Sequence, residues 1–265
     1  MATTLDHGYD LSNPKQEQVS HSDNMKSFSW SIPSEVSNAR ELLAPSDFHP
    51  GTTLHIAARG IGPLRCALLH PELEIPVFDA GGSLAYVSRR QKRCSGNAVL
   101  SHPQRGGLIS TSYFFGPKRE PQIRLLQGAA SAAVIGNDDA NIIKVSGRWS
   151  SRTVSFTTPD GQAFEWKYAR TKDANGKKVN IIALQQIETQ ESKPDSAGKI
   201  IAQLVRGNDT RAEGSSRCSA GNGGQLVLDQ DAAIYLDEAM ILATCLVMLK
   251  KEIDRRTTMQ IMILA

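Results

Sequence analysis

The sequence predicts a mainly β protein, in which a closed antiparallel barrel of about 10–12 strands wraps around one buried hydrophobic helix near the C-terminus. Two observations support this fold class. Short alternating runs separated by turn residues occupy the chain from about residue 52 to 228, a pattern typical of antiparallel strands in a sheet that closes to protect its edges. The later stretch 239–249 is apolar on every side except at Thr244, and such a helix must be surrounded by lipid or by protein.

The length of this apolar stretch favours protein over lipid as its surroundings. Its eleven residues rise about 16 Å as a helix, roughly half the thickness of a bilayer core. That rise instead matches the height of a strand of about five or six residues. Asp237 and Glu238 precede the stretch and four basic residues follow it between 250 and 256, which is the charge order that suits a helix dipole. We therefore expect a helix over about 231–256 that fills the barrel.

Residues 1–50 differ from the rest of the chain in composition, because they are polar and rich in Ser, Asn, Asp, Gln and Pro. We expect this segment to be mostly disordered or loosely packed, followed by the barrel domain at 51–256. The remaining residues, 257–265, are predicted to form a tail that adds an edge strand, covers the barrel mouth or contacts a partner.

The strands of the barrel are expected where apolar and polar residues alternate between turn signals. The clearest pair is a hairpin around Gly161, in which Phe164, Trp166 and Tyr168 share one face of the second strand. We expect that face to pack on the helix. The strands expected are 53–58, 64–69, 75–78, 84–88, 108–115, 123–126, 142–146, 152–157, 163–168, 179–184, 199–205 and 225–228.

Two of these stretches carry a resemblance to a known family. The strand Phe164-Glu-Trp-Lys-Tyr168 follows an Asp-Gly turn, and Leu228-Asp-Gln-Asp231 leads into the apolar helix. Many short strands followed by one late apolar helix resemble the tubby C-terminal-like superfamily, which includes tubby proteins, plant LURP-one-related proteins and phospholipid scramblases. The resemblance covers about residues 50–256 and implies a barrel of roughly twelve strands around a central hydrophobic helix.

The resemblance also suggests a function, with limits. It implies a non-enzymatic binding or adaptor module that engages phospholipid headgroups or a protein partner. None of the lipid-binding residues of tubby proteins can be matched to a position in this chain. The acidic segment and the palmitoylated cysteine cluster of scramblases are absent as well.

Basic residues supply the candidate binding site. The segment 89–93 holds four cations in five residues at an expected strand end, where they could bind phosphate groups of an anionic lipid such as a phosphoinositide. A solvated strand end is the alternative interpretation. The residues predicted to bind a lipid or another anion are Arg89, Arg90, Lys92, Arg93, Arg148 and Arg152.

No pattern in the sequence indicates a catalytic or metal site. The chain has no GxSxG or HExxH motif, and its cysteines and histidines are not paired at ligand spacing. We therefore predict no catalytic residue, no metal and no cofactor. An isomerase or cyclase that uses His55 and His70 in a residual barrel pocket is the alternative hypothesis.

Composition and charge indicate where the protein acts. A hydrophobic share of 40% and a charged share of 22% are ordinary for a globular protein, and a net charge of +3 with no stacking motif disfavours nucleic acid as a partner. The four cysteines form no CxxC pair and no apolar leader follows Met1. We predict a reducing, cytoplasmic location, peripheral at a membrane or nuclear, without a transmembrane span, and leave the oligomeric state open.

Overall fold

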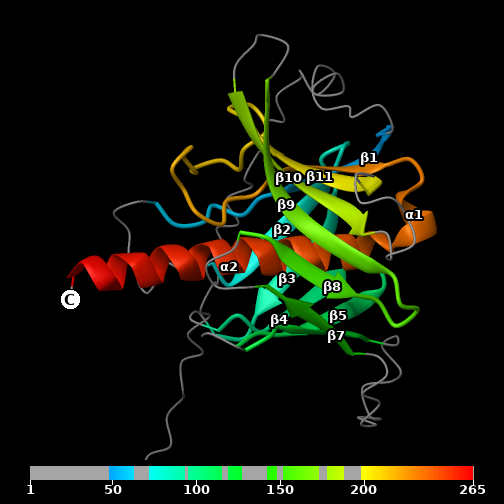
Figure 1. The fold of residues 1–265 in the computed structure, drawn as a ribbon, viewed down its shortest axis with the longest axis horizontal. Helices are drawn as coiled ribbons and strands as arrows, with labels where there is room; N and C mark the ends of the chain where they lie inside the picture. Colours follow the sequence, from blue (N-terminus) through cyan, green and yellow to red (C-terminus); the bar gives the residue numbers. More distant parts are fainter. Residues whose placement is uncertain are drawn as a thin grey trace, which may run out of the picture. The chain divides into compact units, whose positions relative to one another are not determined.

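Within the residues that the structure describes, twelve antiparallel strands close into a barrel around a long helix, as the computed structural model shows (Figure 1). The described residues are 48–62, 72–92, 95–114, 119–126, 142–147, 152–172, 178–187 and 198–264. The expected strand 64–69 and nearly all of the segment 1–50 lie outside them. The strands are β1 (Pro50–Ile56), β2 (Glu74–Asp79), β3 (Leu84–Arg90), β4 (Ala98–His102), β5 (Gly106–Ser112), β6 (Gln122–Leu125), β7 (Ile142–Ser146), β8 (Val154–Thr157), β9 (Ala163–Lys172), β10 (Lys178–Ile187), β11 (Ile200–Arg206) and β12 (Gly224–Asp229).

The strand order is the simplest that a closed barrel can have. Each strand pairs with its neighbours in sequence, and β1 pairs with β12 to close the ring. Closure leaves no unpaired sheet edge. The predicted fold class, a closed antiparallel barrel with a C-terminal helix, is therefore confirmed. Strand β4 was not expected, because Ala98–His102 is short and lacks a clear alternation of apolar and polar residues.

The predicted aromatic face of β9 packs inside the barrel. Phe164 and Trp166 are fully buried, while Tyr168 lies further along the strand and is only partly buried. The indole Nε1 of Trp166 donates a hydrogen bond of 3.1 Å to Oγ1 of Thr244. This hydroxyl in turn donates to the carbonyl oxygen of Ile241 at 3.0 Å. The one polar residue of the apolar stretch is thus fully satisfied, as a buried polar group must be.

Helix α2 (Glu238–Leu264) runs through the barrel and out of one end (Figure 1). It follows the short helix α1 (Ala232–Tyr235), and Oδ1 of Asp237 accepts a hydrogen bond of 2.9 Å from the backbone N–H of Ala239, which satisfies one of the free donors of the first turn. Residues 239–249 are buried except Leu246, which is partly buried. The apolar stretch therefore fills the barrel as predicted.

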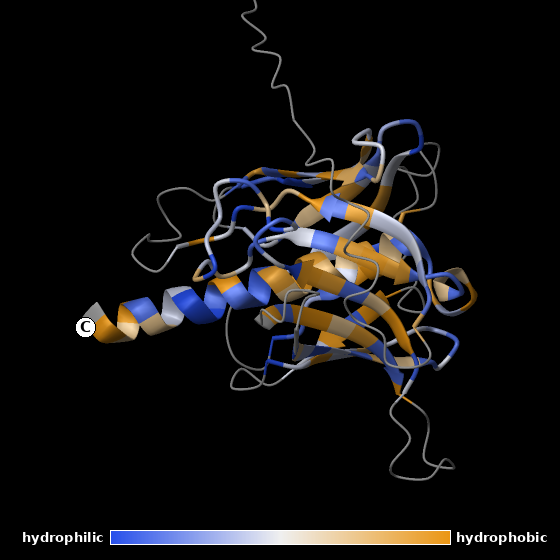
Figure 2. Cartoon of the chain, turned by 90° about the horizontal axis from the view of Figure 1, so that it is seen from above, coloured by the Kyte–Doolittle hydropathy of each residue, from blue (hydrophilic) through white to orange (hydrophobic). Residues whose placement is uncertain are grey.

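The end of α2 differs from the prediction. We expected the helix to finish near residue 256 and residues 257–265 to form a separate tail, whereas the helix continues to Leu264. Its 27 residues correspond to about 40 Å, so the final turns extend beyond the barrel (Figure 2). The basic residues between 250 and 256 consequently lie within the helix rather than in its last turn. No helix of the described ranges has the combination of length and apolar character needed to cross a membrane.

Candidate anion-binding site at the barrel mouth

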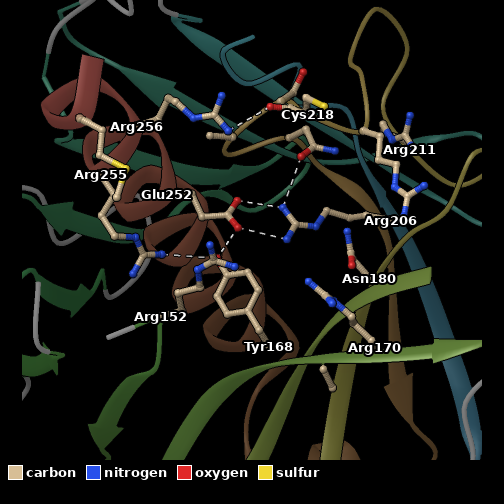
Figure 3. A pocket seen from close by; sticks show the side chains of 16 residues that line it. Arg152, Tyr168, Arg170, Asn180, Arg206, Arg211, Cys218, Glu252, Arg255 and Arg256 are labelled. Carbon is tan, nitrogen blue, oxygen red and sulfur yellow. Dashed lines mark hydrogen bonds and ion pairs between the residues drawn. The ribbon is translucent and has the colours of Figure 1, made fainter. Parts of the chain in front are cut away.

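A pocket of about 660 Å³ opens at the end of the barrel where α2 emerges (Figure 3). Strands β9, β10 and β11, the segment that precedes β8, the loop 207–223 between β11 and β12, and α2 all contribute to its wall. The lining residues are Arg152, Tyr168, Ala169, Arg170, Asn180, Arg206, Arg211, Arg217, Cys218, Ser219, Ala220, Asn222, Glu252, Arg255, Arg256 and Met259.

Arginine dominates this lining. The described residues around the pocket include seven arginines, no lysine and one carboxylate, which leaves a net charge of +6. A guanidinium group presents several N–H donors in a planar fork that matches the oxygens of a phosphate or carboxylate. Like charges brought together at one mouth repel one another, and low-dielectric walls concentrate their field. The electrostatic potential of the pocket therefore favours an anion over a cation or a neutral group.

An ion pair between Arg206 and Glu252 forms the floor of the pocket. Nη1 of Arg206 lies 2.8 Å from Oε2 of Glu252, and Nη2 lies 3.1 Å from Oε1. The side chains are only 9% and 11% exposed. Burial alone would raise the pKa of Glu252, but the charge and hydrogen bonds of Arg206 outweigh it and hold that pKa below its usual value. Both partners are therefore ionised at neutral pH.

Tyr168 connects this ion pair to the arginines above it. Its hydroxyl donates a hydrogen bond to Oε1 of Glu252, and burial together with that carboxylate raises the pKa of Tyr168. The guanidinium groups of Arg152 and Arg206 lie 5.7 and 5.8 Å from the centre of the tyrosine ring, close enough for cation–π attraction. Nη2 of Arg255 donates to the tyrosine hydroxyl at 3.4 Å. Tyr168 thus orients three cations without neutralising any of them.

The loop 207–223 reaches the helix through Gly221. Its φ of +69° is the left-handed conformation that favours glycine, and a Cβ atom there would lie 2.3 Å from Cγ1 of Ile253. The backbone N–H of Gly221 donates to Oε2 of Glu252 at 2.9 Å. The close contact lets the loop lie against α2 and places Arg211 and Arg217 on the pocket wall.

Several of the arginines have no carboxylate partner among the described residues. The side chains of Arg170 and Arg217 make neither a hydrogen bond nor an ion pair within the described part of the chain. Arg211 donates to the side-chain oxygen of Asn208 at 3.3 Å, and Arg256 donates to the backbone oxygen of Cys218 at 3.1 Å. Figure 3 shows arginines from α2 on one side of Glu252 and from the strands and the loop on the other. Their charge remains available for an external anion.

Of the four predicted site residues that the structure describes, only Arg152 lines this pocket. Arg89 and Arg90 are separated by the geometry of β3, in which successive side chains point to opposite faces. Arg89 is exposed and pairs with Glu74 at 2.9 Å. Arg90 points the other way, where burial lowers its pKa and Nη1 donates to the backbone oxygen of Glu72 at 3.5 Å.

The other predicted site residues are placed elsewhere or not described. Lys92 is exposed at the end of β3 and does not line the pocket. Arg93 and Arg148 lie outside the described residues. The structure therefore does not bring Arg89, Arg90 or Lys92 together with Arg152 in one pocket.

The arginines that form the pocket were missed because they are spread along the sequence. Arg206, Arg211 and Arg217 recur every five or six residues, but in a segment that contains many glycines and that was interpreted only as a loose loop. Arg255 and Arg256 were interpreted only as charges that suit a helix dipole. The regular spacing of the arginines in the loop and the adjacent pair of arginines on the helix were the two available signals. Only the fold shows that they converge.

A second cavity tests the alternative hypothesis of an enzyme in the barrel. This cavity lies between α2 and strands β3 to β5 and measures about 20 Å³, which is room for about one water molecule. His55 lies on β1 between the inward-facing Leu54 and Ile56, so its side chain points away from the barrel interior. His70 lies outside the described residues. This cavity inside the barrel is too small to hold a substrate.

Metal and redox chemistry have no visible site in the described part of the chain. Its histidine, cysteine and acidic side chains form no group of three that could hold a metal ion. The two described cysteines, the exposed Cys218 and the buried Cys245, are free thiols. Burial raises the pKa of Cys245 to about 12, so this thiol stays protonated.

Comparison with known proteins leaves the pocket as the main guide to function. No family model, no curated protein and no solved structure matches this chain. The fold and the geometry of the arginine pocket therefore carry the functional argument.

Proposed function

We propose that this protein is a non-enzymatic binding module whose arginine pocket takes a multiply phosphorylated group. The supporting observation is the net charge of +6 that the described residues give a pocket of about 660 Å³, in which the one carboxylate among them is already paired. That volume is within the range of about 300–1,000 Å³ typical of small-molecule sites. The same chemistry would suit the headgroup of a phosphoinositide or a soluble polyphosphate.

The number of arginines around the pocket favours a ligand that carries several phosphate groups. One guanidinium fork can engage one phosphate through two parallel hydrogen bonds. Arg206 is committed to Glu252, and six further arginines among the described residues line the pocket. A ligand with a single phosphate would leave most of this charge unbalanced. A group with several phosphates is therefore the better match.

The resemblance to the tubby C-terminal-like superfamily agrees with this proposal. It implies a barrel of about twelve strands around a central helix, and a fold of that kind is present here. We propose kinship with this superfamily, a phospholipid as the source of the phosphates, and a cytoplasmic location. A protein partner with an acidic or phosphorylated segment could use the same chemistry, and the enzyme alternative is not favoured because the helix fills the barrel.

The double substitution Arg170→Ala/Arg211→Ala tests the proposal. Both side chains line the pocket without a carboxylate partner, so their loss should remove direct contacts to phosphate while leaving the Arg206–Glu252 pair intact. Isothermal titration of the full chain with inositol hexakisphosphate should show at least about tenfold weaker binding, which is about 1.4 kcal/mol. Binding to the wild type should also weaken as salt is raised.

A matched control removes the same amount of charge elsewhere. Arg89→Ala/Lys92→Ala deletes two exposed cations that do not line the pocket and should change the affinity by less than about twofold, because exposed charges are screened by salt. Equal weakening by both double variants would mean that binding follows net charge alone. No binding by the wild type would reject the proposed function outright.

A further inference from the structure

The last turns of α2 expose large apolar side chains to solvent. Met259, Ile261, Met262 and Ile263 are 63%, 56%, 72% and 82% exposed. Successive residues of a helix are rotated by about 100°, so these four point in directions that span more than half of the helix circumference. A contact with one other helix needs only a stripe. An end that is apolar on several sides is suited to immersion in an apolar medium.

The order of residues along α2 matches the order of layers in a membrane surface. Figure 2 shows an apolar end, then a hydrophilic section, then the apolar section inside the barrel. The hydrophilic section contains Arg255 and Arg256, both on the pocket wall. The rise from Arg256 to Ile263 is about 10 Å, comparable with the 5–10 Å depth to which interfacial helices bury their apolar residues.

The apolar end and the pocket form one continuous surface. Met259 is exposed and also lines the pocket, so an anion in the pocket would lie within a turn or two of the apolar side chains. A second copy of this chain would bring the same cluster of arginines against the first. A surface of anionic lipids offers negative charge at the level of the arginines and acyl chains beyond it, as on the cytoplasmic leaflet.

We propose that residues 259–263 insert into an anionic membrane surface while the pocket binds a lipid headgroup. The helix end, defined as Met259, Ile261, Met262 and Ile263, then acts as an anchor in the membrane surface. This inference rests on the proposed function and adds to it the source of the phosphates. It also explains why α2 continues past the barrel that its apolar section fills.

The triple substitution Ile261→Ser/Met262→Ser/Ile263→Ser tests the anchor. The wild-type chain should co-sediment with phosphatidylcholine vesicles that contain phosphatidylinositol bisphosphate. The triple variant should bind these vesicles at least about tenfold more weakly, because three apolar contacts with the acyl region are lost. Titration of the same variant with inositol hexakisphosphate should stay within about twofold of wild type, because none of the three residues lines the pocket.

A matched pair of single variants controls for the loss of an exposed isoleucine. Ile263 and Ile234 are 82% and 75% exposed, and Figure 1 places α1, which carries Ile234, at the opposite end of the barrel from the end of α2. Ile263→Ser should weaken vesicle binding, whereas Ile234→Ser should not.

Three results would overturn the proposed anchor. The first is undiminished vesicle binding by the triple variant alongside normal polyphosphate binding, which would leave the proposed function intact. The second is a wild type that binds the polyphosphate but not the vesicles. The third is a wild-type dimer, measured by light scattering, that becomes a monomer in the triple variant, because a second copy would then cover the helix end. A wild-type chain that does not bind the polyphosphate would instead reject the proposed function.

Discussion

Val247→Asp is expected to leave the protein unfolded. Val247 is 3% exposed and lies in the section of α2 that fills the barrel. The substitution loses about 1.5–3 kcal/mol of apolar burial and adds the cost of several kcal/mol for an unpaired charge taken out of water. The total of at least about 5 kcal/mol is comparable with the whole stability of a typical domain. Circular dichroism and urea titration of the purified variant would measure it.

The same chemical change at the end of the same helix is the control. Ile263 is 82% exposed, so Ile263→Asp should alter the free energy of unfolding by no more than about 0.5 kcal/mol. Leu246 is a weaker test than Val247 because its side chain is only partly buried. A Val247→Asp protein that folds with wild-type stability would contradict the helix-filled barrel.

Glu252→Gln is expected to lower the free energy of unfolding by about 3 kcal/mol, because it leaves Arg206 buried without a counter-charge. The carboxylate also accepts hydrogen bonds from Tyr168 and Gly221, and an amide oxygen retains only part of this network. Binding of the polyphosphate should persist or tighten, since the pocket gains one unit of positive charge. Urea denaturation and calorimetry of the same preparation would separate the two effects.

Acid should remove the difference in the free energy of unfolding between Glu252→Gln and the wild type. The folded pKa of Glu252 lies below its usual value, so the stabilisation is complete above the unfolded pKa of about 4.3. It is lost as the pH falls through the lower folded value. The gap in stability should therefore be full at neutral pH and shrink in stronger acid. Glu74→Gln, which breaks an exposed pair with Arg89, should change stability by no more than about 1 kcal/mol at any pH.

The fold could be predicted because its determinants are local in the sequence. Alternation in the hairpin around Gly161 placed Trp166 against the helix, and the apolar section before Lys250 identified what fills the barrel. The continuation to Leu264 was missed because Arg255 and Arg256 resemble the end of a helix in their charge. In the structure they are an interruption between two apolar sections, one inside the barrel and one outside it.

The pocket could not be predicted, because charges that converge in space are distant in the chain. A dense run such as 89–93 attracts attention, but a strand turns alternate side chains to opposite faces and separates Arg89 from Arg90. The actual cluster needs the pairing of β9, β10 and β11 in the sheet and the close contact of Gly221 with α2. Arg152 was anticipated as a rim residue, and the other six arginines followed only from the three-dimensional arrangement.

A crystal structure of the full chain grown with inositol hexakisphosphate would show whether the arginine pocket binds phosphate groups. We expect density for phosphates between α2 and the loop 207–223. Guanidinium groups of Arg170, Arg211 and Arg255 should lie within hydrogen-bond distance of phosphate oxygens, and the Arg206–Glu252 pair should remain unbroken beneath them. Phosphates bound instead along β3 at Arg89, or an empty pocket in crystals whose protein binds the ligand in solution, would contradict this expectation.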